Sequence, residues 1–377
     1  MASTIYSDQK PKIIVFHPAL APYRVDFFNS ISKAFDASFY FNFPNVIDQE
    51  FDQDSLKKKC NFDINYLQNG VEFFGRSFRS GIVKIIKKEK PEIVLCSEYG
   101  PITFIVFIYY YFLKKKFRLY TLSDDSIENS RTRKGLRSFV RNIISKNISG
   151  VIFPSKDVCD WYYSNISNKT KTLELPIIHD DTLFRNKLAE SINTANENIN
   201  TYKLKDKKVL LFVGRLVKVK NLSFLINAVA QNKSSDWILV IVGEGLLKND
   251  LKIQATNLNI SEKILFVGRK ENLELFSWYT IAQIFILPST YERFGAVVNE
   301  ALLGGCKVLC SNLAGASSLI NEDNGRLFNP FDVKELCSCL QDFIKQSDKT
   351  TEKINHLRVN MMPFTFEQKI DTLIQNL

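Results

Sequence analysis

The sequence predicts an α/β protein with two doubly wound, Rossmann-like domains that face each other across a cleft. Short apolar runs alternate with helical patterns along the whole chain, and this alternation is typical of parallel sheets covered by helices on both faces. The length of 377 residues fits two domains of about 150 residues each. A polar stretch from Arg185 to Asp206 has few large apolar residues and separates the two sets of strands. Ligands of such domains are expected beyond the carboxyl ends of the strands.

The first half of the chain is expected to form one domain over residues 1–180. Apolar runs rich in Val, Ile, Phe and Leu predict strands at Lys12–His17, Phe39–Asn42, Ile93–Ser97, Leu119–Leu122 and Gly150–Pro154. Helical spacing of apolar residues predicts helices at Tyr23–Phe35, Ile82–Lys88, Ile102–Leu113 and Lys134–Asn147.

The second half gives clearer signals and predicts a second domain over residues 207–350. Strands are expected at Val209–Val213, Ile238–Val242, Ile264–Val267, Ile284–Leu287 and Val308–Cys310. Helices are expected at Leu222–Gln231, Leu246–Leu258, Leu273–Tyr279, Ala296–Gly304 and Val333–Lys345. Residues 181–206 then form a linker, and residues 351–377 a helical segment that packs back on the first domain.

Composition excludes several classes of protein. The apolar share of 45% and the charged share of 24% are ordinary for a soluble globular protein. Seven cysteines without a Cys-x-x-Cys pair argue against a disulfide framework and a structural zinc site. The polar start of the chain has no signal-peptide pattern, and the longest apolar run, Pro101 to Leu113, is shorter than the roughly 18 to 20 residues that cross a bilayer. A cytoplasmic protein with reduced thiols is expected.

The net charge of +10 is concentrated in one region. Between Arg76 and Lys156 there are 17 Lys/Arg and 6 Asp/Glu. Such a region attracts anions, although a lysine-rich solvated surface explains it equally well. No zinc-finger, basic-zipper or RNP-type pattern is present, so no nucleic-acid partner is expected.

Part of this basic region fits an anionic membrane surface. Cations cluster at Lys114–Arg118 and Arg131–Lys134, followed by Arg137 and Arg141. On the helix predicted next to them, an apolar stripe accompanies the cations, as in helices that lie on membranes: Leu136, Phe139, Val140, Ile143 and Ile144. The same stripe is also compatible with an ordinary core-facing side.

The strongest chemical motif is the segment Pro288 to Gly295 followed by Glu300. A strand is predicted to end at Pro288 and a helix to open at about Gly295, so that the amides of Phe294, Gly295 and Ala296 form an anion site. Glu292 and Glu300 supply two carboxylates that accept hydrogen bonds from sugar or ribose hydroxyls. Taken alone, Glu292 is better explained as a helix cap and Glu300 as a solvated charge, whereas the whole motif favours a ligand site.

Further candidate residues follow the neighbouring strands. Gly214 and Arg215 come directly after the strand at Val209–Val213, with Lys220 five residues beyond Arg215, and the two cations can converge on one diphosphate. Gly243 and Gly268 follow the next two strands and allow close approach of a ligand to the backbone.

Together these motifs resemble the donor-binding domain of family 4 of the glycosyltransferases, which have the two-domain GT-B fold. The resemblance extends from Val209 to Phe328. It comprises Gly-Arg-Leu with the following lysine, Glu-x-Phe-Gly-x4-Glu-Ala, Gly305 before a strand, Gly315, and Asn324-Gly325-x-Leu-Phe. Lys307 and Ser317 stand where the family usually has Pro and Glu. The first half agrees only in layout and in the exit segment Pro176 to Phe184.

The resemblance implies roles for individual residues. Arg215 and Lys220 would bind the donor diphosphate together with the amides of Phe294 and Gly295. Glu300 would hold the ribose hydroxyls, and Glu292 the hydroxyls of the transferred sugar. The family retains the anomeric configuration and needs no metal or other cofactor, because cations and amides take the metal's place.

The acceptor side is expected at the strand ends of the first domain. His17 ends the first strand, and Asp124 follows the fourth, where its carboxylate can orient or deprotonate an acceptor hydroxyl. Asp125 reads as a helix cap and His17 as a satisfied strand-end histidine. The first strand lacks the glycine pair that many family members have, so Arg24 is a candidate for holding the donor phosphate instead.

The sequence therefore predicts a cytoplasmic, retaining, metal-independent glycosyltransferase. It would move a hexose-type sugar from a nucleotide diphosphate sugar to a glycan or lipid-linked acceptor, as in bacterial surface polysaccharide synthesis. A nucleotide-sugar epimerase of the same fold and a basic protein that binds nucleic acid or lipid remain alternatives. A nicotinamide dehydrogenase is the weakest one, because no Gly-x-Gly-x-x-Gly follows any strand.

Overall fold

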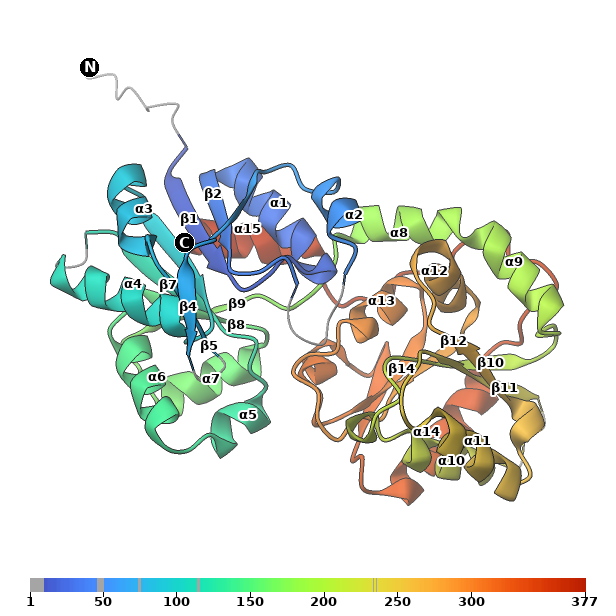
Figure 1. Cartoon of the computed structure of the whole chain (residues 1–377). Coiled ribbons are helices and arrows are strands. Elements are labelled where there is room, and N and C mark those ends of the chain that lie inside the picture. The colour runs from blue at the N-terminus through green and yellow to red at the C-terminus, as the bar shows by residue number, and fades with distance from the viewer. Residues whose placement is uncertain (1–9, 46–50, 74–75, 114–115, 233, 235) are drawn as a thin grey trace, which may run out of the picture. The chain divides into compact units, whose positions relative to one another are not determined.

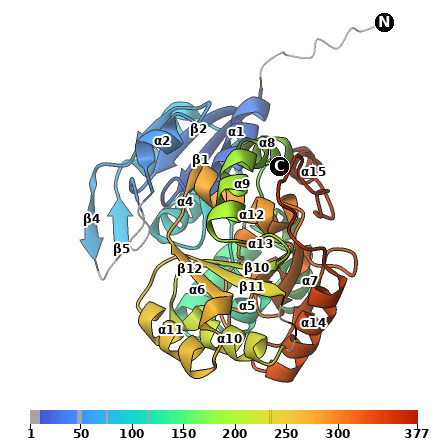
Figure 2. The same cartoon turned by 90° about the vertical axis from the view of Figure 1, so that its right-hand side faces the viewer.

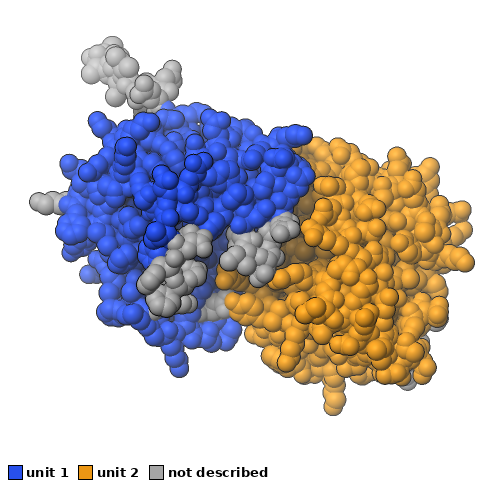
Figure 3. Space-filling view, viewed as in Figure 1, with its two compact units in different colours: residues 1–177, 367–377 blue, residues 178–366 orange. Residues whose placement is uncertain are grey.

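The computed structural model describes residues 10–45, 51–73, 76–113, 116–232, 234 and 236–377, and the chain divides into two compact units (Figure 1). Unit 1 consists of residues up to 177 together with residues 367–377, and unit 2 consists of residues 178–366 (Figure 3).

Unit 1 contains a seven-stranded parallel sheet in the order β3-β2-β1-β6-β7-β8-β9. Its strands are β1 (Lys12–His17), β2 (Asp36–Phe41), β3 (Ile64–Tyr66), β6 (Ile93–Ser97), β7 (Arg118–Leu122), β8 (Gly150–Phe153) and β9 (Lys171–Glu174). Strand order reverses between β1 and β6, and ligands of doubly wound sheets bind beyond the carboxyl ends of the strands at such a point.

Helices cover both faces of this sheet (Figure 1). One face packs on α3 (Ile82–Glu89), α4 (Pro101–Phe112), α6 (Leu136–Lys146) and α7 (Lys156–Asn165). Residues alternate between the faces along a strand, so Tyr40 joins this core while Phe39 turns the other way and packs on Phe28 of α1 (Val25–Ala34). Tyr120 likewise points away from the first core and donates to backbone carbonyls at the end of α15 (Phe366–Asn376).

Unit 2 contains a six-stranded parallel sheet in the order β12-β11-β10-β13-β14-β15. Its strands are β10 (Lys208–Val213), β11 (Trp237–Val242), β12 (Ile264–Gly268), β13 (Ile284–Leu287), β14 (Lys307–Ser311) and β15 (Gly325–Phe328). This is the 3-2-1-4-5-6 order of dinucleotide-binding sheets, and its switch point lies between β10 and β13.

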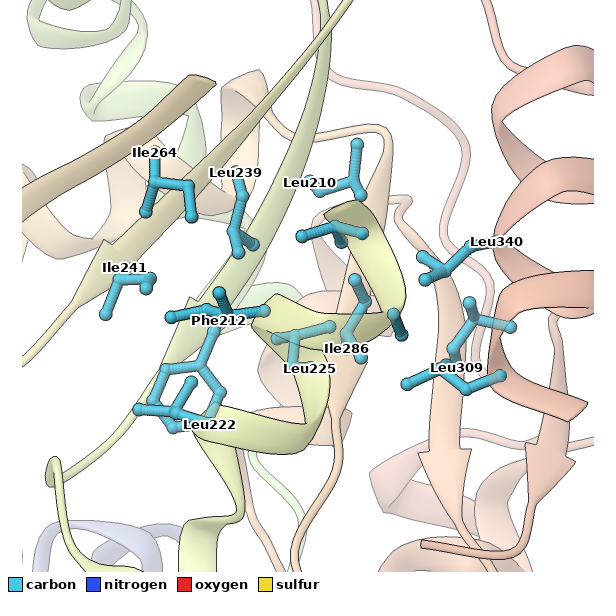
Figure 4. Close-up of a cluster of buried hydrophobic side chains, with 14 of the residues drawn as sticks. Leu210, Phe212, Leu222, Leu225, Leu239, Ile241, Ile264, Ile286, Leu309 and Leu340 are labelled. Atoms are coloured by element: carbon cyan, nitrogen blue, oxygen red, sulfur yellow. The ribbon is translucent and has the colours of Figure 1, made fainter. Parts of the chain in front are cut away.

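Helices α10 (Leu222–Ala230), α11 (Lys248–Asn257) and α14 (Val333–Gln346) cover one face of this sheet. Their apolar side chains meet Phe212, Leu239 and Ile286 of the strands in a continuous core (Figure 4). Helices α12 (Asn272–Ile281) and α13 (Val297–Leu303) also belong to unit 2, and Figure 2 shows them on the opposite side of strands β10, β11 and β12 from α10 and α11.

The linker prediction for residues 181–206 is wrong. Most of this segment forms α8 (Asp181–Glu190) and α9 (Ile192–Thr201), and both helices pack against α12. The segment has few apolar residues, but they recur at helical spacing: Phe184 with Leu188, and Ala195 with Ile199, are all buried. Asp180 caps α8 through a bond from the amide of Leu183 to its side chain.

Several short or edge elements were not predicted: β3, β9, β15, the antiparallel hairpin of β4 (Gly70–Phe73) and β5 (Arg76–Arg79), α2 (Gln53–Lys57), α5 (Ile127–Thr132) and α7.

The C-terminal segment divides between the units. Residues 351–365 lie with unit 2, where the Arg358 guanidinium donates to the carbonyls of Tyr279 and Gly304 at the ends of α12 and α13. Of the helices that the structure describes, none combines the length and apolar character needed to span a bilayer.

Candidate functional site

Three glycines line the carboxyl ends of β10, β11 and β12 in unit 2. The amide of Gly214 donates to the carbonyl of Val242, and the amide of Gly243 donates to that of Gly268. A Cβ on Gly243 would lie 1.9 Å from the carbonyl oxygen of Gly214, and the φ of Gly243 is 143°. Only glycine fits this position. The strand ends therefore form a bare backbone edge, which a ligand can approach closely.

Two cations flank this edge. Arg215 follows Gly214 directly, is exposed, and makes no ion pair with any residue that the structure describes. Lys220 closes a 3-10 turn (Lys218–Lys220) that is followed by Asn221 in the left-handed conformation. This turn brings the Lys220 side chain back over Gly214, so that its Cε would lie 3.7 Å from a Cβ placed there.

Lys220 forms an ion pair with Glu292, across the switch point between β10 and β13. Both side chains are mostly buried. Glu292 lies in the loop after β13, where its backbone pairs with Ala314 and its carbonyl accepts from the amide of Gly315. The loop is further fixed by the amide of Thr290, which donates to the carbonyl of Val219. The predicted cation and the predicted carboxylate thus lie together.

The helix after this loop begins later than expected. Gly295 has a φ of 98°, which a right-handed helix does not allow, and α13 starts at Val297. The amides of Phe294 and Gly295 therefore belong to the loop before the helix, not to its first turn. The Phe294 ring is buried, and its carbonyl accepts from the amide of Ala316.

Glu300 lies in α13 with both carboxylate oxygens engaged. Its Oε2 accepts from the hydroxyl of Tyr279 at 2.6 Å, and its Oε1 lies 3.4 Å from Nε2 of His179. Burial, and secondly the carboxylate of Glu300, raise the pKa of Tyr279 well above its usual value, so the phenol remains a donor. His179 is stacked on Phe184, and its amide donates to the side-chain oxygen of Asn299.

The loop at the switch point between β10 and β13 also contains the hydroxyl of Ser289. Ser289 is fully buried directly after Pro288, and its Oγ has no hydrogen-bond partner among the described residues. A buried hydroxyl without a partner is costly, so Ser289 is a candidate for a hydrogen bond to a polar ligand.

In unit 1, His17 lies at the carboxyl end of β1, as predicted. Its Nδ1 donates to the carbonyl of Ala19 at 2.8 Å, and its ring packs edge-on against Phe28. Burial, and secondly the charge of Arg24, lower the pKa of His17 from 6.5 to about 4. His17 is therefore neutral at pH 7, as expected of a satisfied strand-end histidine.

Arg24 and Asp124 form an ion pair. The Arg24 side chain is almost fully buried, and its charge compensates that of Asp124. From the sequence, Arg24 was instead a candidate for binding the donor phosphate. Asp125 was expected to cap a helix, but it is buried between Arg133 and Arg141 and accepts a bond from the hydroxyl of Ser123. Sequence periodicity does not show which cation pairs with which carboxylate, because the partners lie on different elements.

A small cavity of about 180 Å³ opens at the switch point of unit 1, between the ends of β1 and β6. Its lining includes His17, Asn42 and Glu98. The side-chain oxygen of Asn42 is buried without a hydrogen-bond partner among the described residues. Glu98 has a φ of 59°, and its side chain accepts from the amide of Asp124 at 3.2 Å. A non-glycine residue in the left-handed region is strained, and such strain concentrates at functional sites.

The structure brings the predicted residues together in two sets, one at each switch point. Unit 2 holds Gly214, Arg215, Lys220, Glu292 and Glu300, and unit 1 holds His17, Arg24 and Asp124. Tyr279, His179 and Glu98 were missed. A tyrosine at core spacing gives no functional signal, whereas His179 is one of only three histidines and lies in the exit segment quoted above.

Neither set resembles a metal centre. Within the described parts of the chain, no group of three or more His, Cys, Asp or Glu could hold a metal ion. All seven cysteines are free thiols, and six of them are buried.

Comparison with known proteins agrees with this geometry. Residues 195–357 match the family model "Glycosyl transferases group 1". The chain is 30% identical, over half of each chain, to a protein from Campylobacter jejuni. That protein is N-acetylgalactosamine-N,N'-diacetylbacillosaminyl-diphospho-undecaprenol 4-alpha-N-acetylgalactosaminyltransferase. It is also 30% identical, over 35% of each chain, to UDP-Gal:alpha-D-GlcNAc-diphosphoundecaprenol alpha-1,3-galactosyltransferase from Escherichia coli. The chain thus spans about half and about a third of these two proteins.

A solved structure extends the likeness over both units. Anabaena HepE, crystallised in complex with UDP and glucose, superposes with a TM-score of 0.68 at 17% identity, over 97% of this chain and 100% of that one. The matched segment lies within unit 2 and contains the Lys220–Glu292 pair as well as Glu300. Unit 2 therefore contains the segment that matches the group 1 glycosyltransferase family, and the chain has the GT-B fold.

Proposed function

We propose that this protein is a retaining glycosyltransferase that moves a hexose-type sugar from a nucleotide diphosphate sugar to a glycan or lipid-linked acceptor. The observation that carries the proposal is the Lys220–Glu292 pair, which closes over Gly214 at the switch point of the unit that matches the family. A cation beside a bare backbone edge suits a diphosphate, and a carboxylate beside the cation suits sugar hydroxyls.

In this proposal the donor lies across the strand ends of unit 2. Arg215 and Lys220 bind the diphosphate, joined by the loop amides of Phe294 and Gly295. Glu300, held by Tyr279, accepts hydrogen bonds from the ribose hydroxyls. The diphosphate competes with Glu292 for Lys220, and the carboxylate so released binds the hydroxyls of the sugar.

The chemical step needs no metal or cofactor in this proposal. The acceptor hydroxyl oxygen bonds to the anomeric carbon on the face from which the diphosphate leaves, the bond from that carbon to the phosphate oxygen breaks, and the hydroxyl proton passes to the leaving phosphate. Charge develops on the leaving group, so Arg215 and Lys220 act mainly in the transition state.

Unit 1 would supply the acceptor site at its own switch point. Neutral His17 cannot add positive charge there, and Asp124 is already paired with Arg24. We therefore assign Asp124 to orienting the acceptor hydroxyl, together with Glu98. The names of the two relatives describe undecaprenol-linked substrates, which favours a lipid-linked saccharide as acceptor and a cytoplasmic place in bacterial surface polysaccharide synthesis.

The test is transfer from a panel of nucleotide sugars, measured with the wild type and single variants. Lys220→Ala should lower kcat/KM by about a hundredfold, the cost of removing one group that stabilises developing charge. Glu292→Ala should also lower kcat/KM, because the hydroxyls of the transferred sugar lose a hydrogen-bond acceptor. The matched control is the exposed pair Lys205–Glu352 in the same unit, whose alanine variants should keep full activity. Equal activity in all four variants would remove the site assignment. Incubation without acceptor separates transfer from epimerisation, which needs none.

A further inference from the structure

Helix α4 of unit 1 presents an apolar surface to solvent. Its sequence is apolar or aromatic on every side, apart from one threonine, and a helix of that kind is normally buried. Its outer stripe is nevertheless exposed, in steps of three, four and seven residues: Phe104, Ile108, Tyr111 and Phe112. Phe112 is 80% exposed. By contrast, helix α14 on the outside of unit 2 exposes Lys334, Gln341 and Lys345.

Helix α6 extends this surface. It connects β7 to β8 as α4 connects β6 to β7, and both helices contribute to the same core on one face of the sheet. The stripe predicted on α6 divides in two: Ile144 packs into the core, whereas Leu136 and Phe139 are 77% and 62% exposed. Ile143 is exposed beside them.

The hairpin of β4 and β5 adds two more apolar side chains. Strand β5 lies against α4, and Val71 and Phe78 are exposed on the hairpin. We call the exposed residues of α4, α6 and the hairpin the apolar face. An accumulation of exposed apolar side chains of this kind marks an interaction site in a folded protein.

Cations outnumber acids around the apolar face, although Glu128 is exposed on α5 next to Arg131. Residues 101–118 and 130–149 contain ten Lys/Arg and no Asp/Glu. Arg133 and Arg141 form ion pairs with Asp125, so part of their charge is compensated there. Lys114 and Lys115 lie outside the described residues, as does the Arg137 side chain. The cations that are described and exposed are Lys116, Arg118, Arg131, Lys134 and Lys146, with Lys84, Lys87 and Lys88 on neighbouring α3.

We propose that the apolar face is a docking surface for an anionic lipid bilayer. Aromatic and aliphatic side chains enter the boundary between headgroups and acyl chains, while the surrounding lysines and arginines bind lipid phosphates. Charge complementarity selects this occupant, because a rim in which cations predominate suits a uniformly anionic surface better than the mixed rim of a protein partner. The inference goes beyond the proposed transfer reaction and does not depend on the donor.

The experiment is co-sedimentation of the full chain with vesicles, without any substrate. Vesicles of phosphatidylcholine and phosphatidylglycerol (3:1) are compared with vesicles of phosphatidylcholine alone. The wild type should bind the anionic vesicles, and raising NaCl should release it, because salt screens exposed charges. Replacing Phe112, Leu136 and Phe139 together by Glu should lower the partition coefficient at least tenfold.

The matched control replaces two equally exposed apolar residues of unit 2, Ile253 (60% exposed) and Phe331 (71% exposed), by Glu, and should bind as the wild type does. A double variant, Lys116→Ala with Lys134→Ala, changes only exposed side chains and should weaken binding to the anionic vesicles several-fold. It therefore reports on the contribution of charge even if the triple variant fails to fold. Absence of wild-type binding, or equal losses in patch and control variants, would overturn the proposal. So would a doubled mass in light scattering that the triple variant restores to a monomer, since that result assigns the face to a second copy.

Discussion

Single side chains at the two switch points are held by partners that lie far away in sequence. Arg24 pairs with Asp124, Lys220 with Glu292, and Glu300 with Tyr279. The sequence indicates which residue types are present at the strand ends, because motifs and strand boundaries are local. It does not indicate that Arg24 is buried, since this depends on packing between elements a hundred residues apart.

His17 gives a prediction at this scale. Its pKa is about 4 in the folded protein and 6.5 ordinarily, so as pH falls the unfolded chain takes up the proton first. Its contribution to stability is therefore complete above pH 6.5 and is lost as pH falls from 6.5 to 4. Urea unfolding of wild type and His17→Asn at several pH values should show a difference in unfolding free energy that changes by about 3 kcal/mol over this window. A constant difference would show that His17 does not titrate there.

At the scale of elements, most ends of the central strands were predicted to within one residue, because each strand is a buried run of β-branched and large apolar residues. β1, β6 and β13 match fully. The edge strands β3, β9 and β15 were missed, since their sequences are short and half exposed. The helices α8 and α9 were taken for a linker because four buried residues in a polar segment give a weak pattern.

The glycine edge of unit 2 gives a prediction at this scale. Gly243→Ala places a methyl group 1.9 Å from the carbonyl of Gly214 and imposes a strained φ, so the ends of β10 and β11 must separate. Strain of this kind costs about 1–3 kcal/mol. Affinity for nucleoside diphosphates, measured by calorimetry, should fall at least tenfold. Gly100→Ala meets no atom within 4 Å and serves as the control; a similar loss in this variant would contradict the explanation.

At the scale of the whole molecule, the fold class and the two-domain division followed from the repeated alternation of strands and helices. The exact division did not, because the chain returns to unit 1 for its last helix. In α15, Phe366, Ile370 and Leu373 are buried, and Lys369 pairs with Glu174 of β9.

Leu373→Ala tests how much unit 1 depends on that helix. Removing this buried side chain should lower the unfolding free energy by about 2–5 kcal/mol, whereas Gln375→Ala, at an exposed position of the same helix, should change it little. Chemical denaturation followed by circular dichroism measures both. Equal stability of the two variants would mean that α15 is dispensable for unit 1.

The return of the chain also fixes an order of events during synthesis. Every residue of unit 2 is translated before the helix that completes unit 1 emerges from the ribosome. The surface of the nascent first unit that α15 later covers therefore stays bare while the whole of unit 2 is synthesised.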